Sequence, residues 1–364
     1  MYSETDIEAA VAAGVMTPDA AAALRNYVSS ERSAPSVDEE HFRLITGFND
    51  IFVSIAAAIL LFAVAWIGQS IGPKIGGDGP SPFAGLFVAA TAWGLAEFFT
   101  RKRRMALPSI LLLLAFVAGV LLTVFTTIVL GVGEEMLEDN ERAAALVIAA
   151  SAAIAAGATY FHWKRFRVPI TIAVGAATVV GVVMALIAYA VGDPDNKSME
   201  NVLLGSALVL GLGVFLFAMR WDSSDPRRET RRSDVAFWLH LLAAPLIVHP
   251  IFTLLGLNDG DATIGEAMVV LLVYLLLGLT ALAVDRRALL VSALAYVLFA
   301  LISLFRQFGA VELNIALAAL VIGSGLLLLS AFWHSVRKSV VRPLPAGLQS
   351  RLPVLDRPAA HAAA

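Results

Sequence analysis

Ten stretches of this sequence, each about twenty residues long, carry almost no charge. A hydrocarbon layer of about 30 Å is crossed by roughly 20 helical residues, and a helix satisfies its own backbone N–H and C=O groups without water. The stretches cover residues 48–71, 83–100, 108–132, 143–163, 168–191, 201–220, 235–256, 265–284, 288–305 and 313–333. We therefore predict an all-α, polytopic membrane protein with about ten transmembrane helices.

The composition excludes a water-soluble globular protein. Of the 364 residues, 59% are hydrophobic and 15% are charged, whereas about 25% of residues in soluble domains are charged. The chain has no cysteine, which excludes disulfides, thiolate metal sites and cysteine nucleophiles. It also contains no phosphate-binding loop, HExxH motif or GxSxG motif. We predict that the protein is not an enzyme and holds no cofactor or metal.

The positive charges predict the orientation in the membrane. If the N-terminus is cytoplasmic, 22 of the 26 Lys and Arg residues fall on the cytoplasmic side of the ten stretches. Cytoplasmic loops characteristically carry such an excess. We predict that both termini lie in the cytoplasm and that arginine-rich turns anchor this topology. The predicted anchors are Arg101, Arg103, Arg104, Arg165, Arg232, Arg286 and Arg287.

The basic run at residues 101–104 stands directly before an apolar stretch. A nucleic-acid site would need a larger basic surface with interleaved aromatic residues, or a recognition helix, and the sequence has neither. Contact with anionic lipid is compatible with the position of the run. Glu97 lies four residues before Arg101, which predicts an ion pair within one helix. We expect the lipid bilayer as a partner and no nucleic acid.

Four basic turns share a pattern that suggests internal repeats. Each has an arginine, two further residues, a branched aliphatic residue and then the start of an apolar stretch. The arginines are Arg104, Arg165, Arg232 and Arg287, at spacings of 61, 67 and 55 residues. Such spacings suit tandem helical hairpins, and chance similarity among basic turns is the alternative.

Pairs of small residues one helical turn apart predict close packing of helices in lipid. The pairs are Ala153 with Gly157, Ala177 with Gly181, Ala207 with Gly211, and Ala319 with Gly323. We expect some of these matches to be fortuitous, because Ala and Gly are frequent in this chain.

The sequence before the first apolar stretch has the features of a helical hairpin. Gly14 can end a first helix, and Thr17 can cap a second helix that has Pro18 in its first position. The apolar residues expected between the two helices are Ile7, Val11, Val15, Leu24 and Tyr27.

We predict three parts of the chain. Residues 1–40 form a cytoplasmic helical hairpin with a linker, and this hairpin could dock on the cytoplasmic turns, bind a protein partner or lie on the membrane. Residues 41–335 form the transmembrane helical domain. Residues 336–364 are rich in proline and form a disordered cytoplasmic tail.

The stretches "AGVMTPDAAAAL" and "AVDRRALLVSALAY" resemble those of uncharacterised bacterial membrane proteins, catalogued as domain of unknown function 2157, and their relatives. The resemblance is strongest over residues 6–30. It implies an inner-membrane location and supplies no activity and no functional residues. Arg outnumbers Lys by 21 to 5, which also suggests a GC-rich bacterial genome. We expect the bacterial inner (plasma) membrane.

The stretch over residues 235–256 is the most unusual, because His240, Pro245, His249 and Pro250 occur within eleven residues. The prolines predict a kink with unpaired carbonyl groups, and a broken helix with two imidazoles could form an intramembrane polar site for a solute or a proton. The alternative is that the side chain of His240 extends to the cytoplasmic surface while His249 bonds a neighbouring carbonyl group. The imidazoles would lie about 13.5 Å apart along the axis, which argues against one shared metal site.

Two functional hypotheses follow. The first is a non-enzymatic interaction or envelope role for an integral membrane protein, with the N-terminal hairpin as its cytoplasmic contact. The second is a transporter or permease for a small neutral or lipid-like solute, built around residues 235–256. The lack of charged residues near the middle of the stretches argues against an ion-coupled pump. The sequence predicts no oligomeric state.

Overall fold

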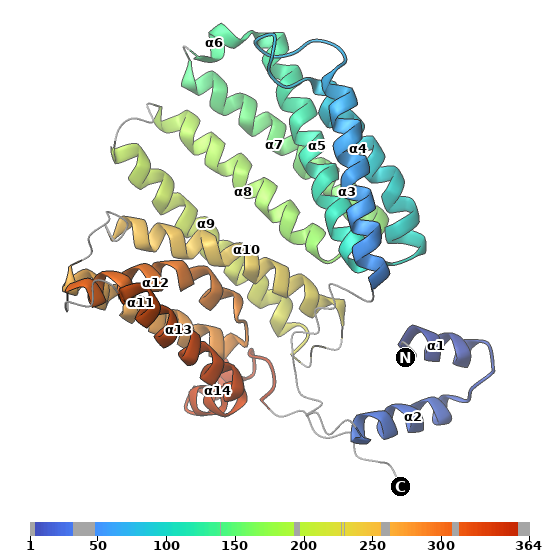
Figure 1. The fold of residues 1–364 in the computed structure, drawn as a ribbon, viewed down its shortest axis with the longest axis vertical. Helices are drawn as coiled ribbons and strands as arrows, with labels where there is room; N and C mark the ends of the chain where they lie inside the picture. Colours follow the sequence, from blue (N-terminus) through green and yellow to red (C-terminus); the bar gives the residue numbers. More distant parts are fainter. Residues whose placement is uncertain are drawn as a thin grey trace. The chain divides into compact units, whose positions relative to one another are not determined.

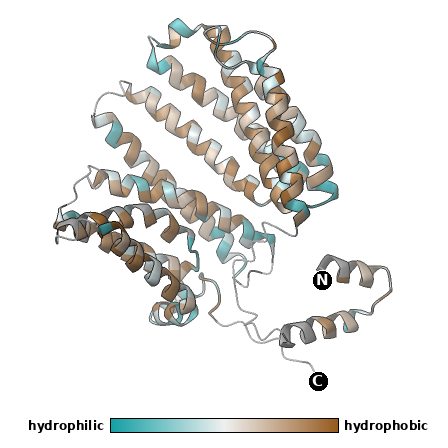
Figure 2. Cartoon of the chain, viewed as in Figure 1, coloured by the Kyte–Doolittle hydropathy of each residue, from teal (hydrophilic) through white to brown (hydrophobic). Residues whose placement is uncertain are grey.

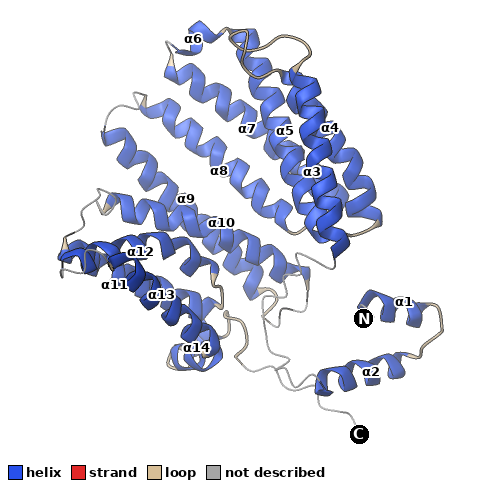
Figure 3. Cartoon of the chain, in the orientation of Figure 1, coloured by secondary structure: helices blue, strands red, loops and turns tan. Residues whose placement is uncertain are grey.

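The computed structural model describes residues 4–31, 48–138, 140–192, 197–226, 228, 230–255, 263–307 and 313–355. The chain divides into two compact units, one with residues 1–42 and 354–364 and the other with residues 43–353. Helices and turns make up the described residues, which contain no strand (Figure 3). The prediction of an all-α protein is confirmed.

The first unit contains two short helices, α1 (Glu4–Ala12) and α2 (Pro18–Glu31). The backbone N–H of Ala20 donates to Thr17 Oγ1 at 3.2 Å, which caps α2 at its N-terminus as predicted. Gly14 has a φ of +71° in the turn between the helices. The two predicted helices and their turn are therefore present.

The predicted apolar contact between these helices is only partly correct. Val15 is 82% exposed, because it lies in the turn after α1, where no helix face directs it inward. Ala21 is fully buried instead. The side chain of Tyr27 lies outside the described residues.

The second unit contains helices that can cross a membrane (Figure 1). Among the described residues, nine are long and apolar enough to do so. They are α3 (Phe48–Gln69), α4 (Pro82–Ala96) continued by the π-helical η1 (Glu97–Lys102), α5 (Ala106–Val132), α7 (Glu141–Phe166), α8 (Ile170–Val191), α9 (Lys197–Ser223), α10 (Arg231–Leu254), α11 (Ile264–Val284) and α13 (Asn314–Ala331). The stretch predicted at 288–305 forms α12 (Ala288–Gln307), whose apolar part Leu289–Ile302 is shorter. The chain is a multi-pass membrane protein.

Hydrophobic residues make up most of the length of these helices, and hydrophilic residues gather near the helix ends (Figure 2). On α3, for example, Phe52, Ile59, Phe62 and Trp66 are between 64% and 69% exposed. Soluble monomers rarely expose continuous apolar surfaces of this kind. Contact with lipid tails accounts for these faces.

The three most extensively packed helix pairs, α4 with α5, α7 with α8 and α9 with α10, are each joined by a predicted cytoplasmic turn, and the members of each pair lie side by side in Figure 1. Among the described residues, each of the four predicted cytoplasmic turns contains one non-glycine residue with a positive φ. They are Arg104 at +53°, Arg167 at +56°, Arg228 at +54° and Asp285 at +60°. This left-handed conformation costs an L-residue about 1–2 kcal/mol. Its position differs among the turns, because Arg167 and Asp285 directly follow a helix whereas Arg104 and Arg228 do not.

Two glycines allow α4 and α5 to meet backbone to backbone. A Cβ atom built on Gly85 would lie 2.5 Å from the carbonyl oxygen of Gly119, and one built on Gly119 would lie 2.7 Å from that of Gly85. No larger residue fits at either position without separating the helices. The sequence pattern at these two positions was not among the predicted small-residue pairs.

Of the four predicted pairs, the one that contains Gly211 forms a close helix contact. A Cβ atom on Gly211 of α9 would lie 2.8 Å from Cβ of Leu246 on α10. Gly181 has an ordinary contact at 3.8 Å, whereas Gly157 and Gly323 have no such atom within 4 Å. The prediction is wrong for these last two glycines, because small residues on a helix face also occur where no neighbour approaches.

α10 is the most enclosed of the nine spanning helices. Within its most apolar window, 56% of the residues are buried, against at most 39% for the others. The helix runs through Pro245 and Pro250 without interruption. Pro250 has no N–H to donate to the carbonyl oxygen of Leu246, four residues earlier. Gly211 of α9 packs closely against this carbonyl group of Leu246.

The predicted disordered tail at 336–364 is folded over residues 336–355. This segment includes most of α14 (Trp333–Val341) and all of α15 (Ala346–Gln349). The guanidinium of Arg337 is buried and donates to the backbone oxygens of Leu282 and Pro353 at 3.2 and 2.6 Å. The prediction was wrong here because composition alone does not reveal such long-range contacts. Residues 356–364 lie outside the described residues.

Candidate functional site: a buried polar cluster

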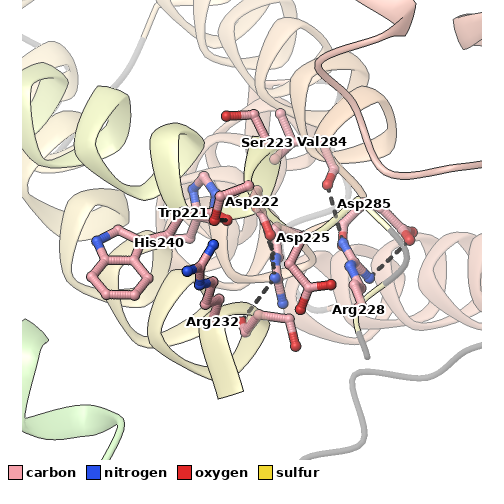
Figure 4. A network of polar contacts seen from close by, with 12 residues as sticks. Trp221, Asp222, Ser223, Asp225, Arg228, Arg232, His240, Val284 and Asp285 are labelled. Carbon is pink, nitrogen blue, oxygen red and sulfur yellow. Dashed lines mark hydrogen bonds and ion pairs between the residues drawn. The ribbon is translucent and has the colours of Figure 1, made fainter. Parts of the chain in front are cut away.

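A cluster of charged residues lies where α9 ends, α10 begins and α11 is followed by α12 (Figure 4). Asp222, in the last turn of α9, accepts two hydrogen bonds from Arg286, at 2.6 Å on Oδ1 and 3.3 Å on Oδ2. Oδ2 also lies 2.9 Å from Nε2 of His240 on α10. The three residues are at most 2% exposed. They form an enclosed triad that joins three segments of the chain.

Arg286 makes further contacts with the start of α10. Its Nη2 atom donates to the carbonyl oxygen of Ser233 at 3.1 Å, and its guanidinium lies 6.0 Å from the ring centroid of Phe237. A buried charge is costly unless it is paired and hydrogen-bonded. Arg286 meets this requirement through contacts that hold α9, α10 and the α11–α12 turn together.

The next residue, Asp285, is the centre of a second group. Its carboxylate accepts hydrogen bonds from Arg228 Nη1 at 3.0 Å and from Trp333 Nε1 at 2.6 Å. Nε of Arg337 lies 3.6 Å from the same carboxylate. Figure 4 shows Arg228 reaching Asp285 from the α9–α10 turn. This group therefore connects that turn, the α11–α12 turn and α14.

The positive surroundings of Asp285 keep it charged. Burial raises the pKa of this carboxyl, but the charges of Arg228 and Arg337 and the hydrogen bond from Trp333 lower it more, so the pKa lies below its ordinary value. Asp285 is accordingly an anion at neutral pH. Its charge offsets the cations buried beside it.

The structure places the four predicted polar residues in different surroundings. His240 belongs to the triad, whereas His249 is exposed and its Nδ1 lies 2.7 Å from the hydroxyl of Tyr296 on α12. Pro245 is exposed and Pro250 is buried. The two histidines thus contact separate partners, and the residues do not converge on one site.

The arginines predicted as topology anchors differ from one another in their contacts and in their exposure. Glu97 pairs with Arg101 at 3.3 Å, as predicted, and with Arg165 at 2.6 Å. Arg286 is buried in the triad, and Arg287 lies over the ring of Trp333 at 4.8 Å. Exposed side chains are found at Arg103, Arg104 and Arg232.

The sequence interpretation did not single out Asp222, Arg228, Asp285 or Arg337. A weak signal was present, because acidic residues immediately beside arginine-rich turns are candidates for pairing. The pairing itself is not local, since Asp222 and Arg286 are 64 residues apart. No pattern within one segment could identify it.

The chemistry available to the triad is limited by its enclosure. An imidazole beside a carboxylate can transfer a proton, but these groups have almost no surface that a substrate could touch. The described residues contain no group of three or more His, Asp or Glu placed to hold a metal ion. Comparison with protein-family models, curated proteins and solved structures found no match.

Proposed function

We propose that this protein is a non-enzymatic membrane protein that acts by binding, with the α1–α2 hairpin as its contact for a protein partner. The observation that carries the proposal is the enclosure of Asp222, His240 and Arg286: the latter two both bond Asp222, and all three are at most 2% exposed. Groups that serve catalysis or ion-coupled transport must reach a substrate or an ion. The triad instead stabilises the junction of three helices.

The separate contacts of His240 and His249 also favour binding over transport. A solute site around α10 would need both imidazoles to face one space, but His240 bonds Asp222 and His249 bonds Tyr296. The prolines of α10 lie in a continuous helix rather than between two half-helices that could hold a solute.

The small size of the hairpin supports its role as a contact. The α1–α2 hairpin belongs to a different compact unit from the membrane helices, and the chain has no cysteine to crosslink it. Residues 4–31 of this hairpin are fewer than the about 40 residues below which a chain usually requires disulfides, metals or association for stability. Ala21 is the single buried residue among its described side chains. A partner protein would cover the surface that this hairpin leaves open.

The proposal places the hairpin in the cytoplasm of a bacterial cell, with the bundle in the inner membrane. The distribution of positive charge supports this orientation, because 22 of the 26 Lys and Arg residues then lie inside. Both termini would share the cytoplasmic side. An envelope or assembly role for this protein with its proposed partner fits this placement.

Photo-crosslinking from the full-length chain in native membranes tests the proposed contact. A crosslinking residue at Val15, which is 82% exposed, should capture a discrete protein. The same residue at the exposed Lys102, on the same predicted side, should not. A Val15 probe that captures only lipid, together with a native complex that loses only the mass of the deleted segment when residues 4–31 are removed, would contradict the proposal.

A further inference from the structure

A cleft of ≈ 190 Å³ lies between α12 and α13 at the end where α14 begins. Its aliphatic lining includes Leu290 and Leu294 from α12 and Leu326 and Leu329 from α13. Arg287, Ser330 and Trp333 complete the lining. The cleft therefore combines an apolar channel with a cation and an indole.

The polar and apolar parts of the cleft are separated along the helices. Leu294 follows Arg287 by seven residues, which corresponds to about 10 Å along a helix. Leu326 precedes Trp333 by the same number of residues. The arginine and the tryptophan consequently lie at one end and the deepest leucines at the other. Arg and Trp at the end of a span are typical of the lipid headgroup level.

The cleft is open to the outside of the bundle. Val291 belongs to its lining and is 65% exposed, and the adjacent Leu327 and Leu328 on α13 are 73% and 59% exposed. Lipid tails would surround these side chains. Sites for drug-sized molecules occupy about 300–1,000 Å³, so this smaller cleft suits a segment of one acyl chain.

Arg287 has donors available for an anion. Its guanidinium lies over the ring of Trp333 at 4.8 Å, and no carboxylate of the described residues pairs with it. The neighbouring charges, Asp285 and Arg286, already bond other side chains. A planar guanidinium with free N–H groups binds phosphate through two parallel hydrogen bonds.

We propose that this cleft binds an anionic phospholipid, with one acyl chain between α12 and α13 and the phosphate on Arg287. The net positive charge of the arginine-rich end complements an anionic headgroup, and the aliphatic channel begins directly below it. This inference does not depend on the proposed protein partner, because it concerns a different part of the chain.

Native mass spectrometry of the delipidated full-length protein, titrated with phosphatidylglycerol or phosphatidylcholine, tests the site. We expect one phosphatidylglycerol to bind in preference to phosphatidylcholine and Arg287→Gln to weaken that binding about 5- to 10-fold. Arg342→Gln removes the same charge from an exposed position after α14 and should leave the affinity unchanged. Arg287→Lys keeps the charge but loses the two parallel donors, so it should retain only part of the affinity.

A second variant tests the acyl-chain channel without changing charge. Leu294→Trp fills the cleft and should weaken phosphatidylglycerol binding by a similar factor, while the unfolding midpoint shows whether the variant is folded. Equal losses for Arg287→Gln and Arg342→Gln would overturn the proposal in favour of diffuse surface attraction. Full competition by millimolar inorganic phosphate would also overturn it, because the acyl chain would then contribute nothing.

Discussion

Asp222→Ala should destabilise the bundle by about 3–5 kcal/mol, the cost typical of breaking one partner out of a buried ion pair. The substitution leaves Arg286, which is 2% exposed, without the carboxylate that accepts two of its hydrogen bonds. It also removes the partner of His240. Unfolding of the full-length protein in mixed micelles, followed by tryptophan fluorescence, measures the change in free energy of unfolding.

Two further variants show whether this loss comes from the unpaired charge. Glu200→Ala removes an exposed acid from the opposite end of the same helix and should change the free energy by less than about 1 kcal/mol. The double variant Asp222→Leu with Arg286→Met should be more stable than Asp222→Ala, because both charges are absent. A double variant as unstable as the single one would show that the triad acts through packing rather than through charge.

Gly85→Val should destabilise the bundle by about 3 kcal/mol or more, because overpacking a tight contact costs 1–3 kcal/mol and backbone atoms cannot rotate away. The added Cβ would begin 2.5 Å from the carbonyl oxygen of Gly119 and 2.7 Å from the backbone nitrogen of Thr123. α4 and α5 would have to separate along their length. The unfolding free energy in micelles again provides the measurement.

Gly94→Val is the matched control for this prediction. Gly94 lies on the same helix and has no atom within 4 Å of an added Cβ, so the variant should remain within about 1 kcal/mol of the natural protein. Similar losses for Gly85→Val and Gly94→Val would mean that valine disturbs α4 itself. The inferred contact between α4 and α5 would then not be responsible.

Features that depend on neighbouring residues could be predicted from the sequence. The apolar stretches located the spanning helices because a helix in lipid needs only its own backbone partners. Thr17 and Pro18 marked the start of α2 for the same local reason. Glu97 and Arg101, one turn apart, also pair as predicted. The unusual composition of residues 235–256 belongs to α10, the most enclosed of the nine spans, but the prolines predicted to break this helix lie within one uninterrupted helix.

Features that depend on distant residues could not be predicted. Which glycine meets a neighbour depends on how helices are placed, so Gly211 was identified correctly while Gly157 was not. The triad joins residues up to 64 positions apart. The folded segment after residue 335 is likewise held by Arg337 through a contact with Leu282, 55 positions earlier. These interactions become visible only when the fold is known.

Labelling of single cysteines in intact cells tests the transmembrane arrangement most directly. The chain has no cysteine, so Lys102→Cys and Glu135→Cys each carry one thiol, at exposed positions before and after α5. A membrane-impermeant maleimide should label Glu135→Cys in intact cells and Lys102→Cys only after the membrane is permeabilised. Labelling of both thiols from the same side would contradict a membrane-spanning α5, and labelling in the reverse order would contradict cytoplasmic arginine turns.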